Sequence, residues 1–72
     1  MREVDLPKGW KRVTFTPKLE VFRKGKIEVS IEKFNSVWIL HGDKGNKTLI
    51  HSKHNMKSTA NKRALFFMKR AK

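Results

Sequence analysis

The stretch KIEVSIEKFNSVWIL, residues 26–40, decides the fold. From residue 27 to residue 32, isoleucine and valine alternate with glutamate and serine. This period of two, with β-branched residues on the apolar side, is typical of a strand that buries one face. Asn35-Ser36 is a turn sequence, and residues 37–41 form a second run of strand-type residues. The stretch therefore predicts an antiparallel hairpin with a two-residue turn.

Further strand-type runs lie on both sides of this hairpin, at residues 10–16, 18–23 and 47–52. Pro17, the Lys24-Gly25 turn and a loop over residues 42–46 separate the runs. Consecutive short strands usually pair with their neighbours in sequence. We therefore predict an antiparallel β-meander of four to five strands, either open or barrel-like.

The C-terminal residues predict one helix packed across this meander, which makes the fold class α+β. Apolar side chains recur there at helical spacing, at Met56, Ala60, Ala64, Phe67, Met68 and Ala71. Asn55 and Ser58 are the candidate N-caps. Successive helical residues project about 100° apart, so we expect Phe67 to face the sheet and Phe66 to face solvent. The residues three and four positions from Phe66 are all cations: Lys62, Arg63, Lys69 and Arg70.

The predicted turn also decides which side chains share a face of the sheet, because side chains alternate along a strand. With Phe34 opposite Val37, the face toward the helix is expected to carry Ile27, Val29, Ile31, Trp38, Leu40 and Leu49. The other face is expected to carry Glu28, Ser30, Glu32, Val37, Ile39, Thr48 and Ile50. We expect the first hairpin to cover the apolar part of that second face, with an exposed interaction patch as the alternative.

Length and composition indicate one small domain. Seventy-two residues suffice for a single core, here residues 10–72 after a flexible basic arm at residues 1–9. The chain has no cysteine, which fits a reducing, cytoplasmic setting. It has neither a secretory signal nor an apolar run near the roughly 20 residues that span a bilayer. We therefore expect no membrane partner.

Charge is the most informative part of the composition. Eighteen lysines and arginines stand against six acidic residues, a net charge of +12. All six acidic residues lie at or before Asp43, so residues 44–72 carry nine positive charges and no negative one. Such a field attracts polyanions, which points to nucleic acid first and to an anionic membrane or an acidic protein next. A membrane-surface helix is disfavoured, because the apolar face of the helix is expected to pack on the sheet. The C-terminal part is expected to meet the partner.

These patterns predict a small nucleic-acid-binding protein, with DNA ahead of RNA, whose phosphate contacts are largely independent of sequence. Lysine and arginine neutralise phosphates, and an aromatic side chain among them can stack on an unpaired base or wedge at a base step. The candidate binding residues are Arg23, Lys24, Lys44, Lys47, Lys53, Lys57, Lys62, Arg63, Phe66, Lys69 and Arg70. A monomer or weak homodimer of this kind suits a phage or bacterial accessory factor, nucleoid-associated when bound to DNA.

Two other interpretations of Phe66 stay open from the sequence. The ring can pack on the aliphatic stems of neighbouring lysines and arginines within a solvated face, or it can fill a dimer contact. For the whole chain, the alternative function is a protein-binding effector whose basic helix docks on an acidic partner surface.

Neither catalysis nor a metal site is predicted. His51 and His54, with His41 and Asp43, superficially resemble a metal-ligand set, but the spacing crosses from strand to helix and lysines surround it. The sequence has no nucleophile–base motif and no glycine-rich phosphate loop. We therefore expect no enzyme, no metal and no cofactor.

Two partial resemblances point in the same direction. The run LPKGWKR, residues 6–12, is similar to the opening of methyl-CpG-binding domains, which place a basic sheet and helix on DNA. This similarity covers seven residues of 72, and that family's DNA-reading arginine and tyrosine pattern does not follow it. The order of strands and helix also resembles small archaeal chromatin proteins, in which a sheet face holding a tryptophan meets DNA. Because Trp38 is expected to face the helix here, no family is assigned and no residue role is carried over.

Overall fold

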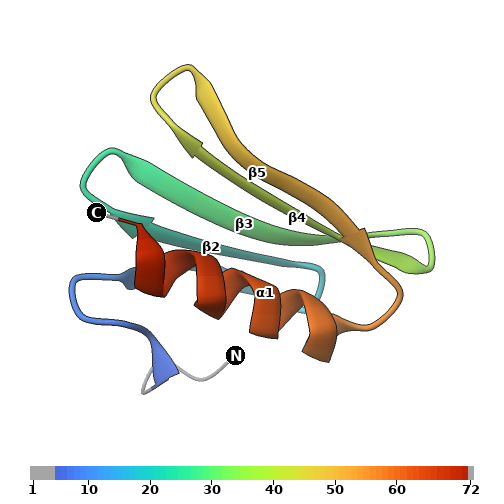
Figure 1. Cartoon of the computed structure of the whole chain (residues 1–72). Helices are drawn as coiled ribbons and strands as arrows, with labels where there is room; N and C mark the ends of the chain where they lie inside the picture. The colour runs from blue at the N-terminus through green and yellow to red at the C-terminus, as the bar shows by residue number, and fades with distance from the viewer. Residues whose placement is uncertain (1–4, 72) are drawn as a thin grey trace.

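The computed structural model describes residues 5–71, which form a five-stranded sheet followed by one helix (Figure 1). The strands are β1 (Lys11–Thr16), β2 (Leu19–Lys24), β3 (Ile27–Phe34), β4 (Val37–Lys44) and β5 (Lys47–His54). The helix is α1 (Lys57–Arg70). The strands pair antiparallel in their order along the sequence. The predicted α+β fold, a meander with a C-terminal helix, is confirmed.

Tight turns set the register of the sheet. The turns after β2, β3 and β4 begin at Gly25, Asn35 and Gly45, whose φ angles are 59°, 57° and 61°. Glycine and asparagine tolerate this left-handed backbone best, so these positions can reverse the chain within two residues. Phe34 pairs with Val37 across the second of these turns, as predicted.

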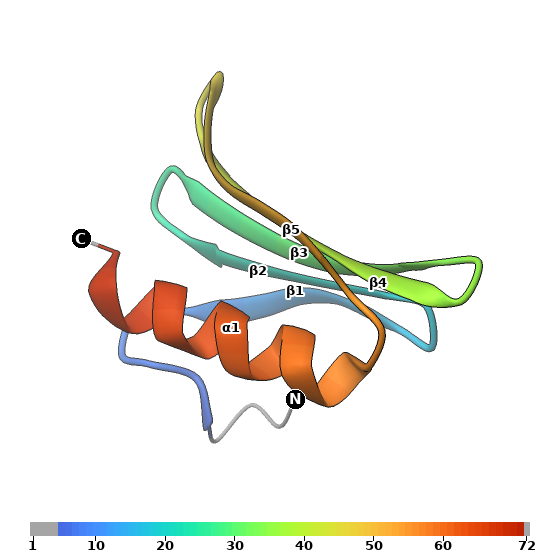
Figure 2. The same cartoon turned by 45° about the vertical axis from the view of Figure 1, so that its right-hand side comes forward.

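The helix covers one face of the sheet, and this face holds the core (Figure 2). Ile31 pairs with Leu40 and Lys33 pairs with Trp38, so the predicted set of side chains faces α1. The buried apolar residues are Trp10, Phe22, Ile27, Val29, Ile31, Leu40, Ala60, Ala64 and Met68. Burying each large member contributes about 1.5–3 kcal/mol. Trp38 and Phe67 are half-buried and pack against this cluster.

A β-bulge in β5 moves Ile50 to the helix side. Gly42 pairs with Ile50, but the next residue, Asp43, pairs with Thr48, so β5 holds Leu49 as an extra residue. Because a bulge breaks the alternation of side chains, Leu49 and Ile50 both turn toward α1. The prediction that Ile50 lies on the opposite face, which assumed strict alternation, is therefore wrong.

The sheet is open rather than barrel-like. β1 and β2 lie beside β3 in one sheet, so the first hairpin does not cover the face opposite α1, contrary to expectation. Val37 and Ile39 on that face are only half-buried. We call this surface the open face; along β3 and β4 it carries Glu28, Ser30, Glu32, Phe34, Val37, Ile39, His41 and Asp43.

Two contacts hold α1 on the sheet, one near each end. Near its start, Glu20 is 1% exposed, and its carboxylate oxygens lie 3.4 Å from Arg12 and 3.3 Å from Lys57. A buried carboxylate requires such cations, because an uncompensated buried charge is costly. Near its end, the Trp10 indole N–H donates a 3.2 Å hydrogen bond to the Met68 carbonyl. The first contact thus ties the start of α1 to β1 and β2, and the second ties its last turns to the residue before β1.

The helix begins without a side-chain cap. Its N-cap residue is Met56, so the prediction of Asn55 or Ser58 in that role is wrong. The Ala60 amide donates a 3.2 Å hydrogen bond to the Met56 carbonyl. At the other end, Lys69 and Arg70 occupy the last turn, where the helix dipole favours cations. Of the predicted arm, residues 1–4 lie outside the described residues.

Leu6 packs against the core cluster just before β1. The Trp10 amide donates a 3.1 Å hydrogen bond to the Pro7 carbonyl, which turns the chain toward the first strand. Over residues 5–71, no helix combines the length and the apolar character needed to cross a membrane.

Candidate functional site

Phe66 lies on the outer face of α1 between two arginines, as its helical spacing predicts. The residue is 50% exposed. The guanidinium carbons of Arg70 and Arg63 lie 4.5 Å and 5.9 Å from the centre of its ring. Both distances fall within the cation–π range of about 6 Å. The Phe66 ring is therefore exposed to solvent with a guanidinium group close to it on two sides.

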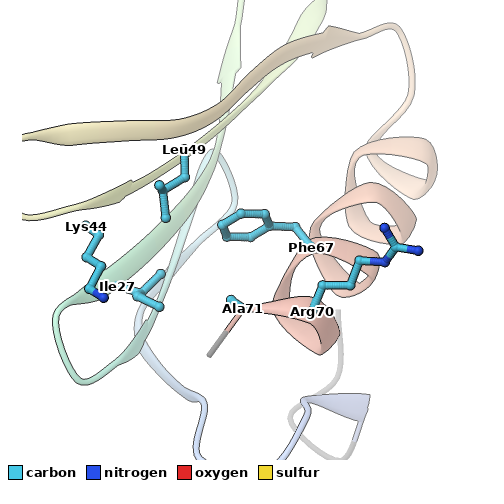
Figure 3. Close-up of a pocket in the computed structure, with 6 residues that line it drawn as sticks. All are labelled: Ile27, Lys44, Leu49, Phe67, Arg70 and Ala71. Atoms are coloured by element: carbon cyan, nitrogen blue, oxygen red, sulfur yellow. The ribbon is translucent and has the colours of Figure 1, made fainter.

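Beside this ring, a groove separates the C-terminal end of α1 from the β4–β5 hairpin. It has a volume of about 350 Å³ and is lined by Ile27, Lys44, Leu49, Phe67, Arg70 and Ala71. Figure 3 shows Phe67 reaching from the helix toward Leu49, with Ile27 and Lys44 on the strands and Arg70 on the helix. The groove thus has an apolar floor with Lys44 on the strand side, and the Arg70 side chain borders it on the helix side with its guanidinium lying against Phe66.

Two smaller hollows continue the groove at both ends. One, of about 230 Å³, shares Leu49, Phe67 and Arg70 and adds Ile50, Arg63 and Phe66. The other, of about 250 Å³, shares Ile27 and Lys44 and adds Lys24, Gly25 and Lys26. We call the three together the hairpin–helix groove. It runs from Phe66 past Leu49 to the β2–β3 turn.

The bulge and one glycine create the space for this groove. The bulge turns Leu49 and Ile50 toward the helix, where they line the groove. Gly42 on β4 lies beneath them, and a Cβ atom there would be 2.7 Å from Ile50 Cγ2 and 3.3 Å from the Phe67 ring. A larger residue at position 42 would therefore push Ile50 and Phe67 out of their present positions.

Charge is sorted between the two sides of the molecule. Among residues 5–71, no acidic side chain lines the hairpin–helix groove. Glu28, Glu32 and Asp43 project from the open face, according to the strand register. Glu20 is buried beneath the start of α1. A polyanion therefore meets only cations at the groove, and meets carboxylates if it approaches the open face.

Several of the predicted binding residues come together here. Lys24, Lys44, Arg63, Phe66 and Arg70 line the groove, although they come from β2, β4 and α1. Of three further predicted residues, Lys62 and Lys69 are exposed on α1, and Lys47 pairs with the groove residue Lys44 at the hairpin end.

The other predicted residues are placed elsewhere. Arg23 lies 2.7 Å from Glu28 in an ion pair on the open face. Lys53 pairs with Ile39, which also puts it on that face. Lys57 turns toward the buried Glu20, and its ammonium lies 5.3 Å from the centre of the Trp38 ring.

Sequence reasoning missed the apolar floor of the groove. From the sequence, Ile27 and Leu49 are expected only on the core side of the sheet and Ala71 only in the apolar stripe of the helix, and none of the three is expected in a binding site. Lys26 also lines the groove; it shares a turn with the candidates Arg23 and Lys24 but is not among the candidate binding residues, although its place beside Gly25 in that turn is a usable signal. The floor forms where α1 packs beside the bulge in β5, and no local sequence pattern predicts this contact.

The three histidines do not form a shared site. The rings of His41 and His51 lie 5.8 Å apart, edge to face, on the open face. His54 lies on the other side of the sheet, where its Nε2 is 2.8 Å from the Ser52 hydroxyl. Throughout residues 5–71, no group of three or more His, Cys, Asp or Glu side chains could hold a metal ion.

The chain matches no protein-family model, no curated protein and no solved structure. What the hairpin–helix groove could bind is therefore inferred from its chemistry. This chemistry consists of a cationic rim, an apolar floor and an exposed phenylalanine at one end.

Proposed function

We propose that this protein binds nucleic acid, DNA ahead of RNA, through the hairpin–helix groove and the basic outer face of α1. The contacts are chiefly to phosphates and select little for sequence. The observation that carries the proposal is the setting of Phe66. Phe66 is half-exposed and lies against Arg63 and Arg70 at one end of the groove. The remaining cations of the groove come from the sheet, at the end of β4 and at the β2–β3 turn.

The separation of charge supports a polyanionic ligand. The rim cations follow a line from Arg63 and Arg70 on the helix to Lys44 and then to Lys24 and Lys26. A phosphate backbone carries negative charge along its whole length, so it can satisfy such a line with successive phosphates. Contacts of this kind position the ligand without reading its bases, which explains the expected lack of sequence selection.

Salt dependence tests the proposal directly. In a fluorescence anisotropy titration with a labelled 15-nucleotide strand, about six phosphate contacts give a log–log slope between −4 for a single strand and −5 for a duplex. Both strand types, as DNA and as RNA, are titrated at several salt concentrations. A flat salt dependence contradicts phosphate binding.

A matched pair of variants tests the location. Replacing Arg63 and Arg70 with glutamine removes two charges from the groove and should weaken binding strongly. Replacing Lys18 and Lys33 with glutamine removes the same charge from exposed positions at the other end of the sheet and should have a much smaller effect. Equal losses would indicate that only net charge matters. Binding to polyglutamate with none to nucleic acid would indicate the protein-binding alternative.

A further inference from the structure

We propose that the hairpin–helix groove seats an unpaired base, so that the preferred ligand is single-stranded rather than duplex nucleic acid. This inference rests on the proposed function and adds to it the strand state of the ligand. Phosphate contacts alone need only exposed cations on a convex surface. The groove offers in addition an apolar hollow that lies between those cations.

The floor of the groove has the chemistry of a base-binding surface. Ile27, Leu49, Phe67 and Ala71 supply apolar atoms, and the volume of about 350 Å³ is within the range of about 300–1,000 Å³ typical of small-molecule sites. A nucleobase is flat and its faces are weakly solvated, so burial of those faces against aliphatic and aromatic side chains is favourable. No carboxylate among the described residues lines this hollow, which keeps it accessible to a nucleotide.

The cations are placed for a backbone that crosses over such a base. Lys44 lies on the strand side of the hollow, and Arg70 borders the hollow on the helix side, with its guanidinium directed away from Leu49 and Lys44 (Figure 3). A nucleotide seated in the hollow would place its base on the floor, one flanking phosphate near Lys44, and the next part of the strand toward the Arg70 guanidinium, which lies against Phe66. In a duplex, the base faces are covered by stacking, so only the rim could be used and the floor would stay exposed.

Arg70 connects this seat to a second aromatic contact. It lines the hollow at the centre of the groove and also lies 4.5 Å from the centre of the Phe66 ring. A strand that leaves the first seat along α1 therefore reaches the half-exposed Phe66 next. Proteins that bind single strands combine a positively charged groove with aromatic side chains on which successive bases stack, and arginine can add cation–π contacts.

Three probes of equal length separate base contacts from phosphate contacts. The probes are a 15-nucleotide oligothymidine, an abasic strand with the same phosphates, and a 15-base-pair duplex, each titrated by anisotropy at one salt concentration. We expect the oligothymidine to bind about tenfold or more tightly than the abasic strand, because each stacked base contributes about a 5- to 150-fold gain. It should also bind more tightly than the duplex.

A floor variant assigns the gain to the groove. Leu49→Gln keeps every charge and should bring oligothymidine affinity close to that of the abasic strand. Phe34→Gln, an equivalent change at an exposed apolar residue of the open face, should leave it unchanged. Circular dichroism shows whether both variants fold. If Leu49→Gln does not fold, the comparison of the three probes on the wild-type protein still decides the proposal.

The possible failures are distinguishable. Equal affinity for the abasic strand and oligothymidine, or tighter binding of the duplex, overturns the base seat and leaves phosphate binding intact. Failure of all three probes to bind overturns both proposals. In that case, binding of a peptide of alternating glutamate and leucine would assign the groove to an acidic protein segment.

Discussion

The guanidinium of Arg70 lies 4.5 Å from the centre of the Phe66 ring, and the same side chain lines the groove in which Phe67 is seated. Consecutive phenylalanines thus have different roles, one exposed and one forming the groove floor. The helix brings this about because neighbouring residues project about 100° apart. Arg70 links the two surfaces, so a ligand that contacts Phe66 also meets the groove.

Phe66→Ala should weaken oligothymidine binding by about 1–3 kcal/mol, the cost of losing one base–aromatic stack. Stability should change little, because Phe66 is half-exposed and alanine is the better helix former. Anisotropy gives the affinity and urea denaturation gives the free energy of unfolding. Phe34→Ala removes an even more exposed phenylalanine from the open face and serves as the control.

A Phe66→Leu variant separates stacking from simple packing on arginine stems. Leucine can cover the stems but cannot stack on a base. If Phe66→Leu binds as tightly as the wild type, the ring has no stacking role.

Gly42→Ala should destabilise the fold by about 1–3 kcal/mol, the usual cost of overpacking. The added methyl group would lie 2.7 Å from Ile50 Cγ2 and 3.3 Å from the Phe67 ring. Ile50→Ala removes the closer of these obstacles, so the double variant should be less destabilised than the sum of the single variants. Urea denaturation of all four proteins measures this coupling. Strictly additive losses would show that the crowding at Gly42 is relieved in another way.

Local patterns predicted most of the fold. The alternation over residues 27–32 and the Asn35-Ser36 turn fix the β3–β4 register because both act within a few residues. The division between Phe66 and Phe67 is equally local. These interactions involve neighbours in sequence, so no knowledge of the tertiary structure is needed to infer them.

The features that shape the site are not local. The bulge at Leu49 shifts the pairing of β5 with β4 by one residue, and strict alternation therefore misplaces Ile50. The same limit applies to Lys57, a candidate phosphate ligand in the sequence that lies 3.3 Å from the buried Glu20 in the structure. Ion pairs between residues far apart in the sequence determine where such side chains point, and the apolar periodicity of the sequence does not reveal these pairs.

Glu20→Gln should cost about 1–3 kcal/mol of unfolding free energy, because a charged hydrogen bond from Arg12 and an ion pair with Lys57 are weakened in a buried site. The loss stays below the 3–5 kcal/mol typical of a fully buried pair, since the Arg12 and Lys57 side chains are 19% and 31% exposed. Glu28→Gln breaks the exposed pair with Arg23 and should cost less than about 1 kcal/mol. Urea denaturation compares the two. Equal losses would contradict a special role for the buried carboxylate in holding α1.

Lysine footprinting should locate the bound strand without any mutation. Brief acetylation at low salt, with and without saturating oligothymidine, is followed by mass spectrometry of each lysine. We expect several-fold protection of Lys44, because it lines the groove and an ammonium paired with phosphate reacts slowly. Lys18 and Lys33, at the other end of the sheet, should react equally in both samples. Protection concentrated on Lys53 would instead place the strand on the open face, beside Glu32, and would contradict the argument from charge.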